Sequence, residues 1–521
     1  MYLRRFYFII LVYANLKMEY DTKDKTFWKR KGNDMKVLLG AVNAKYIHSN
    51  LAVYCLKAYA EKYGDTSDEI SIGEYTINQQ LDEILRDIYK RKPDMLCLSC
   101  YIWNLTYVEE ICREIKKVMP QIIIWIGGPE VSYDGVKVLE RLPEVDGVMK
   151  GEGEQTFCDL LHFYQDKTVD GFQNMKGIVY REQTGQIVEN EWRKTMDLSK
   201  VPFVYENMEL FEHKIIYYET SRGCPFSCSY CLSSIDKCLR FRDLELVKKE
   251  LQFFIDNKVP QVKFVDRTFN CKHDHAMAIW RYITEHDNGI TNFHFEIAAD
   301  LITEEELAIM EQMRPGLIQL EIGVQSTNME TVHEIDRVMD LDLVRNVTAK
   351  VKSFGNIHQH LDLIAGLPGE DLDDVKHTLE EIEALKPDSL TVHSLAIKRA
   401  ARLNMFKEEY ADLKINNTPE MIALSEACAR RMGMEPYYLY RQKNMAGNFE
   451  NVGYSLPGKA CIYNILIMEE MQTIAACGAG TTTKVVFPSE NRRERCENVK
   501  EVEQYISRID EMIGRKEKII H

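Results

Sequence analysis

Three closely spaced cysteines, Cys224, Cys228 and Cys231, are the group of side chains in this chain best suited to chemistry. Their C-x3-C-x2-C spacing places three thiolates where they can bind three irons of a cubane iron-sulfur cluster. Such clusters are usually closed by four cysteine thiolates, and no fourth cysteine follows at an obvious spacing. The sequence therefore predicts a [4Fe-4S] cluster with one open iron, to which a substrate or cofactor can bind.

With Tyr230 directly before the last cysteine, the motif resembles the radical S-adenosylmethionine (SAM) superfamily. The resemblance implies that the amino and carboxylate groups of SAM chelate the open iron. It also implies that an electron from the cluster cleaves SAM to a 5'-deoxyadenosyl radical. The alternatives are three buried free thiols, or a zinc knuckle short of one ligand. Zinc sites are normally four-coordinate, and Cys238 lies too far along the chain to complete a familiar spacing.

The overall composition is that of a large globular protein. The 521 residues are 45% hydrophobic, with a formal net charge of -15 and a pI near 5.5. This acidic balance disfavours a general nucleic-acid or anionic-membrane surface. The fourteen cysteines show no secreted disulfide framework, and a cluster of this kind needs a reducing compartment, so we expect a cytoplasmic protein.

The first residues look at first like a secretory signal, because Arg4 and Arg5 precede the apolar run 6–13. That run is too short to span a bilayer, and no small-residue cleavage site follows it. The first convincing strand begins directly after Met35. We expect residues 1–34 to be a non-native or disordered extension.

Continuous apolar strands alternate with helices from Met35 onwards. This alternation is typical of a doubly wound, Rossmann-type parallel sheet, whose ligands bind at the carboxyl ends of the strands. We therefore predict an α/β domain over residues 35–165. Its expected strands are 36–42, 94–99 and 121–126, and its expected helices are 51–62 and 106–119.

This first segment resembles the cobalamin-binding domain found ahead of many radical SAM enzymes. The resemblance rests on Ser99, expected to face the dimethylbenzimidazole tail, on Gly127 and Gly128, where the backbone can approach the nucleotide loop, and on the Gly-Glu-Gly-Glu run 151–154. The family's Asp-x-His-x-x-Gly loop is replaced by residues 43–48, so the usual axial histidine is missing. His48 is a candidate ligand, although a solvated or structural role is the alternative. Either cobalamin binds without a protein ligand, or the domain has kept the fold and lost the cofactor.

A polar connector over residues 166–210, with a hairpin at 177–188, leads to a second predicted domain. Its strands alternate with helices and fit the partial (β/α)6 barrel of the radical SAM superfamily. The cysteine loop follows the first strand, where such barrels place their chemistry. We expect the barrel over 211–400 and an α+β extension, a substrate or accessory region, over 401–521. The strand candidates are 214–218, 261–266, 293–297, 316–323, 360–364 and 389–393.

Several strand ends match the positions at which the superfamily holds SAM. The run 321–326 resembles the fourth-strand element that reaches the ribose and methionine, and 362–370 resembles the fifth-strand motif near the adenine. Residues 266–270 replace the usual Gly-Gly-Glu element and carry two side chains suited to the methionyl ammonium. The alternative is that these are strand ends capped by turn residues. The implied contacts are Tyr230, Asp266, Asn270, Glu321, Gly323, Gln325, Ser326, Asp362 and Gly366, with Ile364 and Leu367 packing near the adenine.

The resemblance changes along the chain. Residues 35–361 resemble cobalamin-domain radical SAM proteins of unassigned substrate, whereas 362–521 resemble oxygen-independent coproporphyrinogen III dehydrogenases. The join falls in a segment that both groups share, which indicates a gene fusion or an assembly artefact. In the dehydrogenase interpretation, basic side chains meet the propionates of a tetrapyrrole, since guanidinium groups match carboxylates bidentately; a solvated basic surface is the alternative. The basic candidates are Lys398, Arg399, Arg402, Arg441 and Lys443.

Three functions stay open at this point. The first is a cobalamin-dependent radical SAM enzyme that abstracts hydrogen from, rearranges or methylates an unidentified small molecule. The second is oxidative decarboxylation of coproporphyrinogen III, although Ser233 and residues 220–222 stand where the dehydrogenases carry a further cysteine and a histidine. The third is a non-catalytic cobalamin or cluster sensor. The enzymatic interpretations imply a low-potential electron donor such as flavodoxin or ferredoxin.

Overall fold

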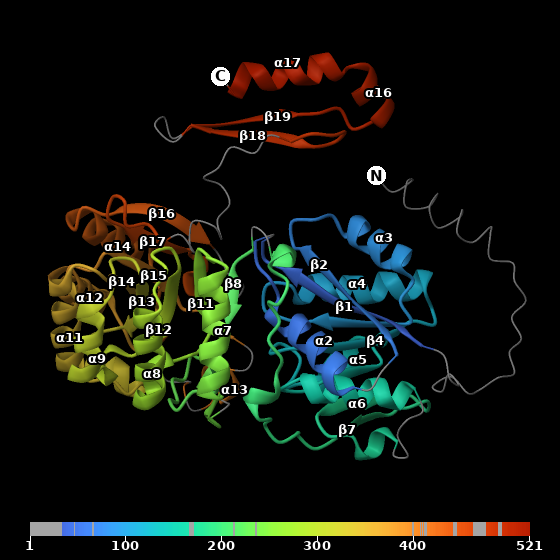
Figure 1. Cartoon of the computed structure of the whole chain (residues 1–521), viewed down its shortest axis with the longest axis horizontal. Coiled ribbons are helices and arrows are strands. Elements are labelled where there is room, and N and C mark those ends of the chain that lie inside the picture. The colour runs from blue at the N-terminus through green and yellow to red at the C-terminus, as the bar shows by residue number, and fades with distance from the viewer. Residues whose placement is uncertain are drawn as a thin grey trace, which may run out of the picture.

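A computed structural model shows two α/β domains followed by a smaller C-terminal unit (Figure 1). Within the part of the chain that the structure describes, no helix is both long and apolar enough to cross a bilayer. The predicted extension 1–34 lies, apart from Asp34, outside the described residues. These are 34–45, 47–64, 67–165, 171–211, 214–234, 237–398, 401–406, 408, 410, 414–440, 445–461, 476–487 and 492–520.

The first domain is a seven-stranded sheet with helices on both faces. Its strands are β1 (Lys36–Asn43), β2 (Glu69–Thr76), β3 (Met95–Ser99), β4 (Ile123–Gly127), β5 (Gly147–Met149), β6 (Ile178–Arg181) and β7 (Ile187–Glu189). Its helices are α2 (Leu51–Tyr63), α3 (Leu81–Arg91), α4 (Leu105–Val118), α5 (Gly135–Arg141) and α6 (Glu154–Tyr164). The strand order is β2-β1-β3-β4-β5-β6-β7, parallel as far as β5. This confirms the predicted doubly wound fold.

Each face of this sheet has its own apolar core. Helices α3, α4 and α5 cover one face, where Ile88 and Ile111 are fully buried, and α2 and α6 cover the other, around Trp125 and Phe157. The hairpin β6–β7, which the sequence places in the connector, pairs antiparallel with β5. Its buried Val179 faces Val148 across that pair, so the hairpin completes the sheet edge rather than linking domains.

The second domain is an open barrel whose first six strands are parallel. They are β8 (Ile216–Tyr218), β11 (Gln261–Phe264), β12 (Asn292–Ile297), β13 (Ile318–Gln325), β14 (His358–Ala365) and β15 (Ser389–Ser394). The covering helices are α7 (Leu244–Asp256), α8 (His273–Glu285), α9 (Glu304–Gln312), α10 (Met329–Glu334), α11 (Leu341–Phe354) and α12 (Leu372–Leu385). All six predicted strands are present in the expected order. Figure 1 shows the long helices on the outside of the strands.

The two faces of the barrel strands differ in chemistry. Outward residues such as Phe264, Phe293 and Leu320 are buried under the helices. The alternating inward residues include Lys263, His294 and Glu321, which are ionisable. Since side chains alternate between the faces of a strand, this pattern gives an apolar shell around a polar lumen.

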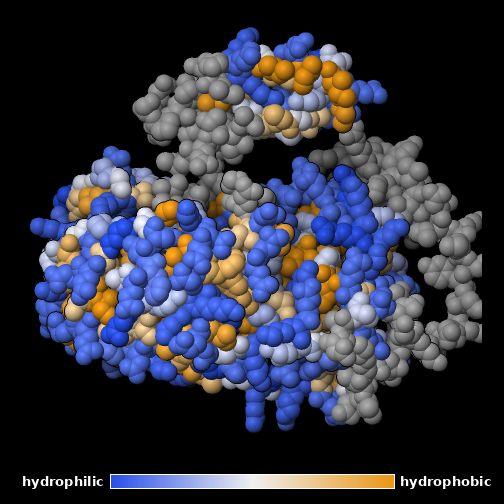
Figure 2. Space-filling model, in the orientation of Figure 1, coloured by the Kyte–Doolittle hydropathy of each residue, from blue (hydrophilic) through white to orange (hydrophobic). Residues whose placement is uncertain are grey.

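Part of the predicted C-terminal extension belongs to the barrel sheet. Strand β17 (Asn451–Ser455) pairs antiparallel with β15, and β16 (Glu435–Tyr440) pairs with β17. The remaining elements are α13 (Arg402–Met405), α14 (Pro419–Arg431), the hairpin β18 (Thr482–Phe487) and β19 (Arg492–Glu497), α16 (Val502–Ser507) and α17 (Ile509–Ile520). Figure 2 shows apolar side chains on the outside of the last two helices, where Val502 and Ile506 are exposed.

Candidate active site

The cysteine loop leaves β8 through the short strand β9 (Ser221–Arg222). Gly223 has a φ of +90°, and a Cβ there would lie 2.7 Å from the carbonyl oxygen of Cys238, so this turn requires glycine. Cys224 and Cys228 are buried, and Cys231 is half-buried. The Cys231 amide donates to the Cys228 carbonyl at 3.0 Å. The loop therefore presents its thiols from one compact turn.

A half-buried arginine lies beside these thiols. Arg337 Nη1 is 3.9 Å from Cys228 Sγ and donates to the Tyr230 hydroxyl at 3.3 Å. Burial raises the pKa of Cys228, and the Arg337 cation opposes that shift. The thiolate is the metal-binding form of cysteine, so Arg337 favours ligation. Arg337 was not predicted from the sequence, because nothing local marks a residue so far along the chain from the motif.

The donor set fits a cluster better than a single ion. Within the described residues, no three His, Cys, Asp or Glu side chains converge on one metal position. A zinc knuckle requires such convergence, whereas the cysteines of a cubane bind different irons. Three thiols on one loop, with a cation beside Cys228, are therefore suited to a [4Fe-4S] cluster with an open iron.

Gln325, at the end of β13, has a backbone conformation and a side-chain environment suited to contact with a ligand. Its φ is +72°, an unusual conformation for a residue other than glycine, and the β13–β14 register shifts between Gly323 and Gln325. The Gln325 side-chain oxygen is buried without a hydrogen-bond partner. A Cβ on Gly323 would lie 2.4 Å from Gln325 Nε2, so a larger residue there would require the Gln325 side chain to shift. Strained backbone of this kind concentrates at functional sites, and an unused amide oxygen fits a polar contact to SAM.

Two other predicted SAM contacts, Asp266 and Asn270, have partners within the protein. Asp266 accepts from the Thr220 amide and hydroxyl, at 3.1 and 2.7 Å, and from the Ser221 hydroxyl at 2.6 Å. Asn270 exchanges two hydrogen bonds with the backbone of Ala298. The structure therefore gives Asp266 and Asn270 a second role, bracing the cluster loop and the end of β12.

Ser326 is likewise engaged, since its hydroxyl donates to Glu370 at 2.5 Å. Burial raises the pKa of Glu370 to about 7, while the Ser326 hydrogen bond opposes that shift. This contact joins the end of β13 to the loop that follows β14. In the described contacts Ser326 positions the neighbouring Gln325 rather than facing open space.

Glu321 and Asp362 belong to a charged group in the barrel lumen. Lys263 Nζ lies 2.7 Å from Glu321 and 3.1 Å from Glu296, and His294 lies 2.9 Å from Glu321. Burial alone would raise the pKa of Glu321, but Lys263 and His294 outweigh that effect and hold the pKa well below its usual value. The strand ladder places Glu296, Glu321 and His360 at one level. The sequence analysis missed Lys263 and His294, although an ionisable residue inside an apolar strand is a usable signal.

Asp362 lies one step nearer the barrel mouth than Glu321. His360 Nε2 and His393 Nε2 lie 3.3 and 3.2 Å from its Oδ1. Gly366 follows at a φ of +86°, and a Cβ there would lie 2.9 Å from Asn417. Leu367 is buried in a small apolar cluster with Ile364 and Tyr230 packed against it. This apolar floor, directly beside the cysteine loop, is the predicted adenine side of the SAM site.

The carboxyl ends of β3 and β4 provide the predicted cobalamin surface. Ser99 and Gly127 stand opposite each other in the β3–β4 pairing. Gly128 has a φ of +115°, and a Cβ on it would lie 2.5 Å from the Cys100 carbonyl oxygen. The strand-end surface therefore stays flat, as close approach of a nucleotide loop requires. The residues present fit cobalamin at this edge.

The His48 side chain is engaged with Tyr217 of the barrel and is therefore a poor candidate for a cobalt ligand. Its Nδ1 lies 2.6 Å from the Tyr217 hydroxyl of β8, and the two rings are stacked. Burial, with Lys214 and Lys45 nearby, lowers the pKa of His48 to about 4. The side chain thus belongs to the contact between the domains.

We expect cob(II)alamin bound to this protein to carry no histidine nitrogen on cobalt. Electron paramagnetic resonance of samples with natural and 15N-labelled histidine should give identical hyperfine patterns, because the label changes only a protein imidazole. His48→Asn should leave the spectrum unchanged. A pattern that changes with the label and is lost in His48→Asn would contradict this expectation.

The predicted basic substrate residues divide into two groups. Arg399, Arg441 and Lys443 lie outside the described residues. Arg402 pairs with Asp336 at 2.7 Å and donates to the Ser227 carbonyl at 3.3 Å, so it braces the cluster loop. Lys398 remains near the barrel mouth after β15.

The environment of Lys398 shows which loops meet there. Burial lowers the pKa of Lys398, Cys231 and Glu130 raise it, and Arg267 lowers it. Glu130 belongs to the loop after β4 of the first domain, whereas Arg267 and Lys398 follow β11 and β15 of the barrel. Loops of the first domain and of the barrel are therefore near enough at Lys398 for their charges to act on it.

Two protein families match the two domains at these positions. The B12 binding domain matches residues 37–161 and the Radical SAM superfamily matches residues 218–382. The chain contains a B12 binding domain and a Radical SAM domain. Both resemblances drawn from the sequence for residues 35–361 are thereby confirmed. The cofactors of these families are a [4Fe-4S] cluster, SAM and cobalamin, and the chain is an enzyme.

Two curated relatives represent the two resemblances. The chain is 26% identical over 338 residues to the cobalamin-dependent radical SAM methyltransferase TokK of Streptomyces tokunonensis, covering 60% of this chain and 48% of that protein. It is 38% identical over 221 residues to the oxygen-independent coproporphyrinogen-III oxidase-like protein HemZ of Bacillus subtilis, covering 42% of this chain and 44% of that protein. The chain spans about half the length of the curated relatives it matches. A 221-residue match is longer than the segment 362–521, so the HemZ-like resemblance extends upstream of Asp362.

A solved structure shares the fold over most of the chain. The radical SAM methyltransferase TsrM of Kitasatospora setae, solved with cobalamin and a [4Fe-4S] cluster bound, superposes with a TM-score of 0.60 at 15% identity. The match covers 82% of this chain and 85% of that one. The order of cobalamin-binding domain and partial barrel is thus that of a known architecture.

Proposed function

We propose that this enzyme is a cobalamin-dependent radical SAM methyltransferase that acts on a small-molecule substrate. The observation that carries the proposal is the junction of the B12 binding domain with the Radical SAM domain, where Arg222 beside the cluster loop pairs with Glu152 and Glu154 at 3.0 and 2.6 Å. Methyl transfer by this chemistry needs one substrate within reach of both cofactor surfaces, and this junction brings the two domains together. The relatives named as methyltransferases support the same class.

When bound, the cluster and SAM supply a carbon radical, and cobalamin supplies a methyl carrier; the protein orients and shields these groups. Gln325 and the apolar floor at Leu367 would hold SAM over the barrel. Lys398 and Arg267 place positive charge where the substrate enters. They favour a substrate with a negatively charged or hydrogen-bond-accepting group. A low-potential donor of the flavodoxin or ferredoxin type would provide the electron.

The test is anaerobic reconstitution with iron, sulfide and cobalamin, followed by reduction in the presence of SAM. We expect both 5'-deoxyadenosine and S-adenosylhomocysteine to form, the second only when cobalamin is present. Formation of 5'-deoxyadenosine alone, with or without cobalamin, would indicate hydrogen abstraction or rearrangement instead. Formation of neither product would favour a sensor.

Coproporphyrinogen III oxidation is the second candidate, and the similarity to HemZ favours it. In the same assay, added coproporphyrinogen III should remain unconverted. Arg402, one of its expected propionate contacts, already pairs with Asp336 at 2.7 Å. Protoporphyrinogen formation at enzyme-like turnover would replace the methyltransferase with this activity.

A further inference from the structure

Arg222, two residues before Cys224, is the centre of a charged network. Its Nε donates to both oxygens of Glu219, at 3.0 and 2.9 Å. Its Nη1 donates to Glu152 at 3.0 Å and its Nη2 to Glu154 at 2.6 Å. Arg240 also donates to Glu152, at 2.9 Å. The five side chains are 6% to 21% exposed, so the network is largely shielded from water.

The members of this network come from both domains. Both Glu152 and Glu154 belong to the Gly-Glu-Gly-Glu run 151–154 of the first domain; Glu152 lies between β5 and α6, and Glu154 is the first residue of α6. In the antiparallel pairing of β9 with β10 (Arg240–Phe241), Arg222 lies opposite Arg240. Arg222 also directly precedes Gly223, which begins the cluster loop. One guanidinium thus ties the strand-end loop of the cobalamin-binding domain to the base of the cluster loop.

The domains are already joined elsewhere. The Ile215 amide donates to the Ile47 carbonyl at 2.8 Å, and the Ser49 hydroxyl donates to the Ile215 carbonyl at 3.0 Å. Tyr54 of α2 packs against Phe211 with 4.8 Å between ring centroids.

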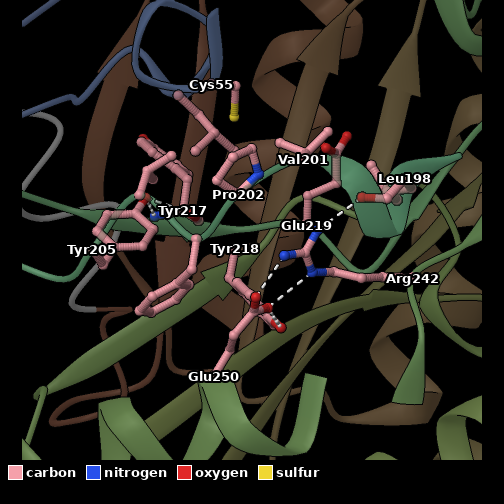
Figure 3. Close-up of a pocket in the computed structure, with 13 residues that line it drawn as sticks. Cys55, Leu198, Val201, Pro202, Tyr205, Tyr217, Tyr218, Glu219, Arg242 and Glu250 are labelled. Carbon is pink, nitrogen blue, oxygen red and sulfur yellow. Dashed lines mark hydrogen bonds and ion pairs between the residues drawn. The ribbon is translucent and has the colours of Figure 1, made fainter. Parts of the chain in front are cut away.

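Figure 3 shows the same junction in close-up. Cys55 of α2, Val201 of the connector and Tyr205 line a small apolar pocket above β8. Below it, Arg242 pairs with Glu250 at 2.5 Å and holds the Leu198 carbonyl at 2.8 Å. Adhesion between the domains therefore does not depend on Arg222.

The chemistry of this network suits it to fixing the relative position of the two domains rather than to holding them together. Buried ion pairs contribute little net stability, because desolvation offsets their attraction, and in some proteins their role is to specify one arrangement. A guanidinium is suited to this role, since its planar fork fixes the direction of each hydrogen bond. Arg222 uses that fork on three carboxylates at once. Displacing it by even a small distance breaks several charge-assisted bonds together.

We infer that Arg222 is a positioning residue that holds the cluster loop in register with the cobalamin-binding domain. The inference rests on the proposed function in one respect: methyl transfer requires the two cofactor sites to address one substrate. A misplacement of about 1 Å can lower a rate about a hundredfold. Cleavage of SAM needs only the barrel and should be far less sensitive.

The test compares Arg222→Met with Arg193→Met. Arg193 is a matched control, because it pairs with Asp159 and donates to Thr156 and the Lys176 carbonyl, all within the first domain. In Arg222→Met we expect cluster iron and 5'-deoxyadenosine formation within about threefold of the unaltered protein, and cobalamin-dependent S-adenosylhomocysteine formation lowered about a hundredfold. In Arg222→Lys, S-adenosylhomocysteine formation should lie between that of the unaltered protein and that of Arg222→Met, since a lysine cannot bind three carboxylates in the same geometry. Arg193→Met should change neither product.

A second readout does not depend on the proposed function. In the full chain without cofactors, Arg222→Met should raise amide hydrogen exchange in residues 219–224 and 151–156 together. Glu154→Gln, which keeps the shape and removes one charge, should raise exchange in the same two segments to a smaller extent. Arg193→Met should leave 219–224 unchanged.

The outcomes separate the two ideas. Coupled exchange without S-adenosylhomocysteine in any variant would retain the positioning role and reject the methyltransferase. Unchanged amide hydrogen exchange in residues 219–224 of both Arg222→Met and Glu154→Gln would overturn the inference. Equal loss of 5'-deoxyadenosine and S-adenosylhomocysteine in Arg222→Met, with amide exchange as in the unaltered protein, would also overturn it.

Discussion

Cys228→Ala should abolish 5'-deoxyadenosine formation and remove most of the cluster iron. Cys224, Cys228 and Cys231 supply all the thiolates of the loop, and a cluster with an open iron has no spare cysteine ligand to lose. Cys228 is buried, and Arg337 lies 3.9 Å from its sulfur. The measurements are iron and sulfide content after anaerobic reconstitution, the ultraviolet-visible spectrum, and 5'-deoxyadenosine released after reduction with SAM.

Cys112→Ala is the matched control for this variant. Cys112 is fully buried on α4 in the first domain, remote in the fold from the cluster loop, so its replacement also removes a buried thiol. It should keep the iron content and the 5'-deoxyadenosine yield of the unaltered protein. Full iron content and turnover in Cys228→Ala would show that the cluster assignment is wrong.

The parts of the site that are local in sequence could be predicted from it. The three cysteines lie on one loop, and that loop follows the first barrel strand, as barrel chemistry requires. The six parallel strands were visible because buried parallel strands appear as continuous apolar runs. Ser99 and Gly127 were recognisable because strand ends in a doubly wound sheet meet at one edge.

The parts that depend on distant residues could not be predicted. Arg337 meets Cys228 through folding alone, because the two residues are 109 positions apart in the sequence. The roles of Asp266 and Asn270 were also hidden, since their bracing hydrogen bonds to Thr220, Ser221 and Ala298 join separate loops. The hairpin β6–β7 has the polar composition of a linker, yet pairing with β5 places it in the first sheet. In each case tertiary contact, rather than local pattern, decides the role.

Lys263→Met should destabilise the barrel by about 3–5 kcal/mol, the usual cost of breaking a buried ion pair. Lys263 is 3% exposed, and it neutralises Glu321 and Glu296, which stand opposite each other on β13 and β12. Removing its charge leaves the carboxylates of Glu321 and Glu296, which are 26% and 33% exposed, facing each other without the Lys263 cation. The measurement is the barrel transition in urea at pH 8. Lys176→Met, which removes an exposed partner of Glu191, should not shift the unfolding midpoint.

The pH dependence distinguishes lost charge from lost packing. Burial would raise the pKa of Glu321, but Lys263 and His294 hold it well below its usual value in the folded protein. Glu321 therefore stabilises the folded protein at pH values above the pKa of a glutamate in the unfolded chain, about 4.3. That contribution is lost as the pH falls through the folded-state pKa. Without Lys263 the folded-state pKa rises, so the variant takes up protons on folding and regains stability as the pH falls from 8 towards 5. The deficit of Lys263→Met should thus shrink at pH 5, and Glu296→Gln added to it should restore part of the loss at pH 8. A deficit below about 1 kcal/mol at both pH values, typical of exposed pairs, would mean that Lys263 does not neutralise these carboxylates.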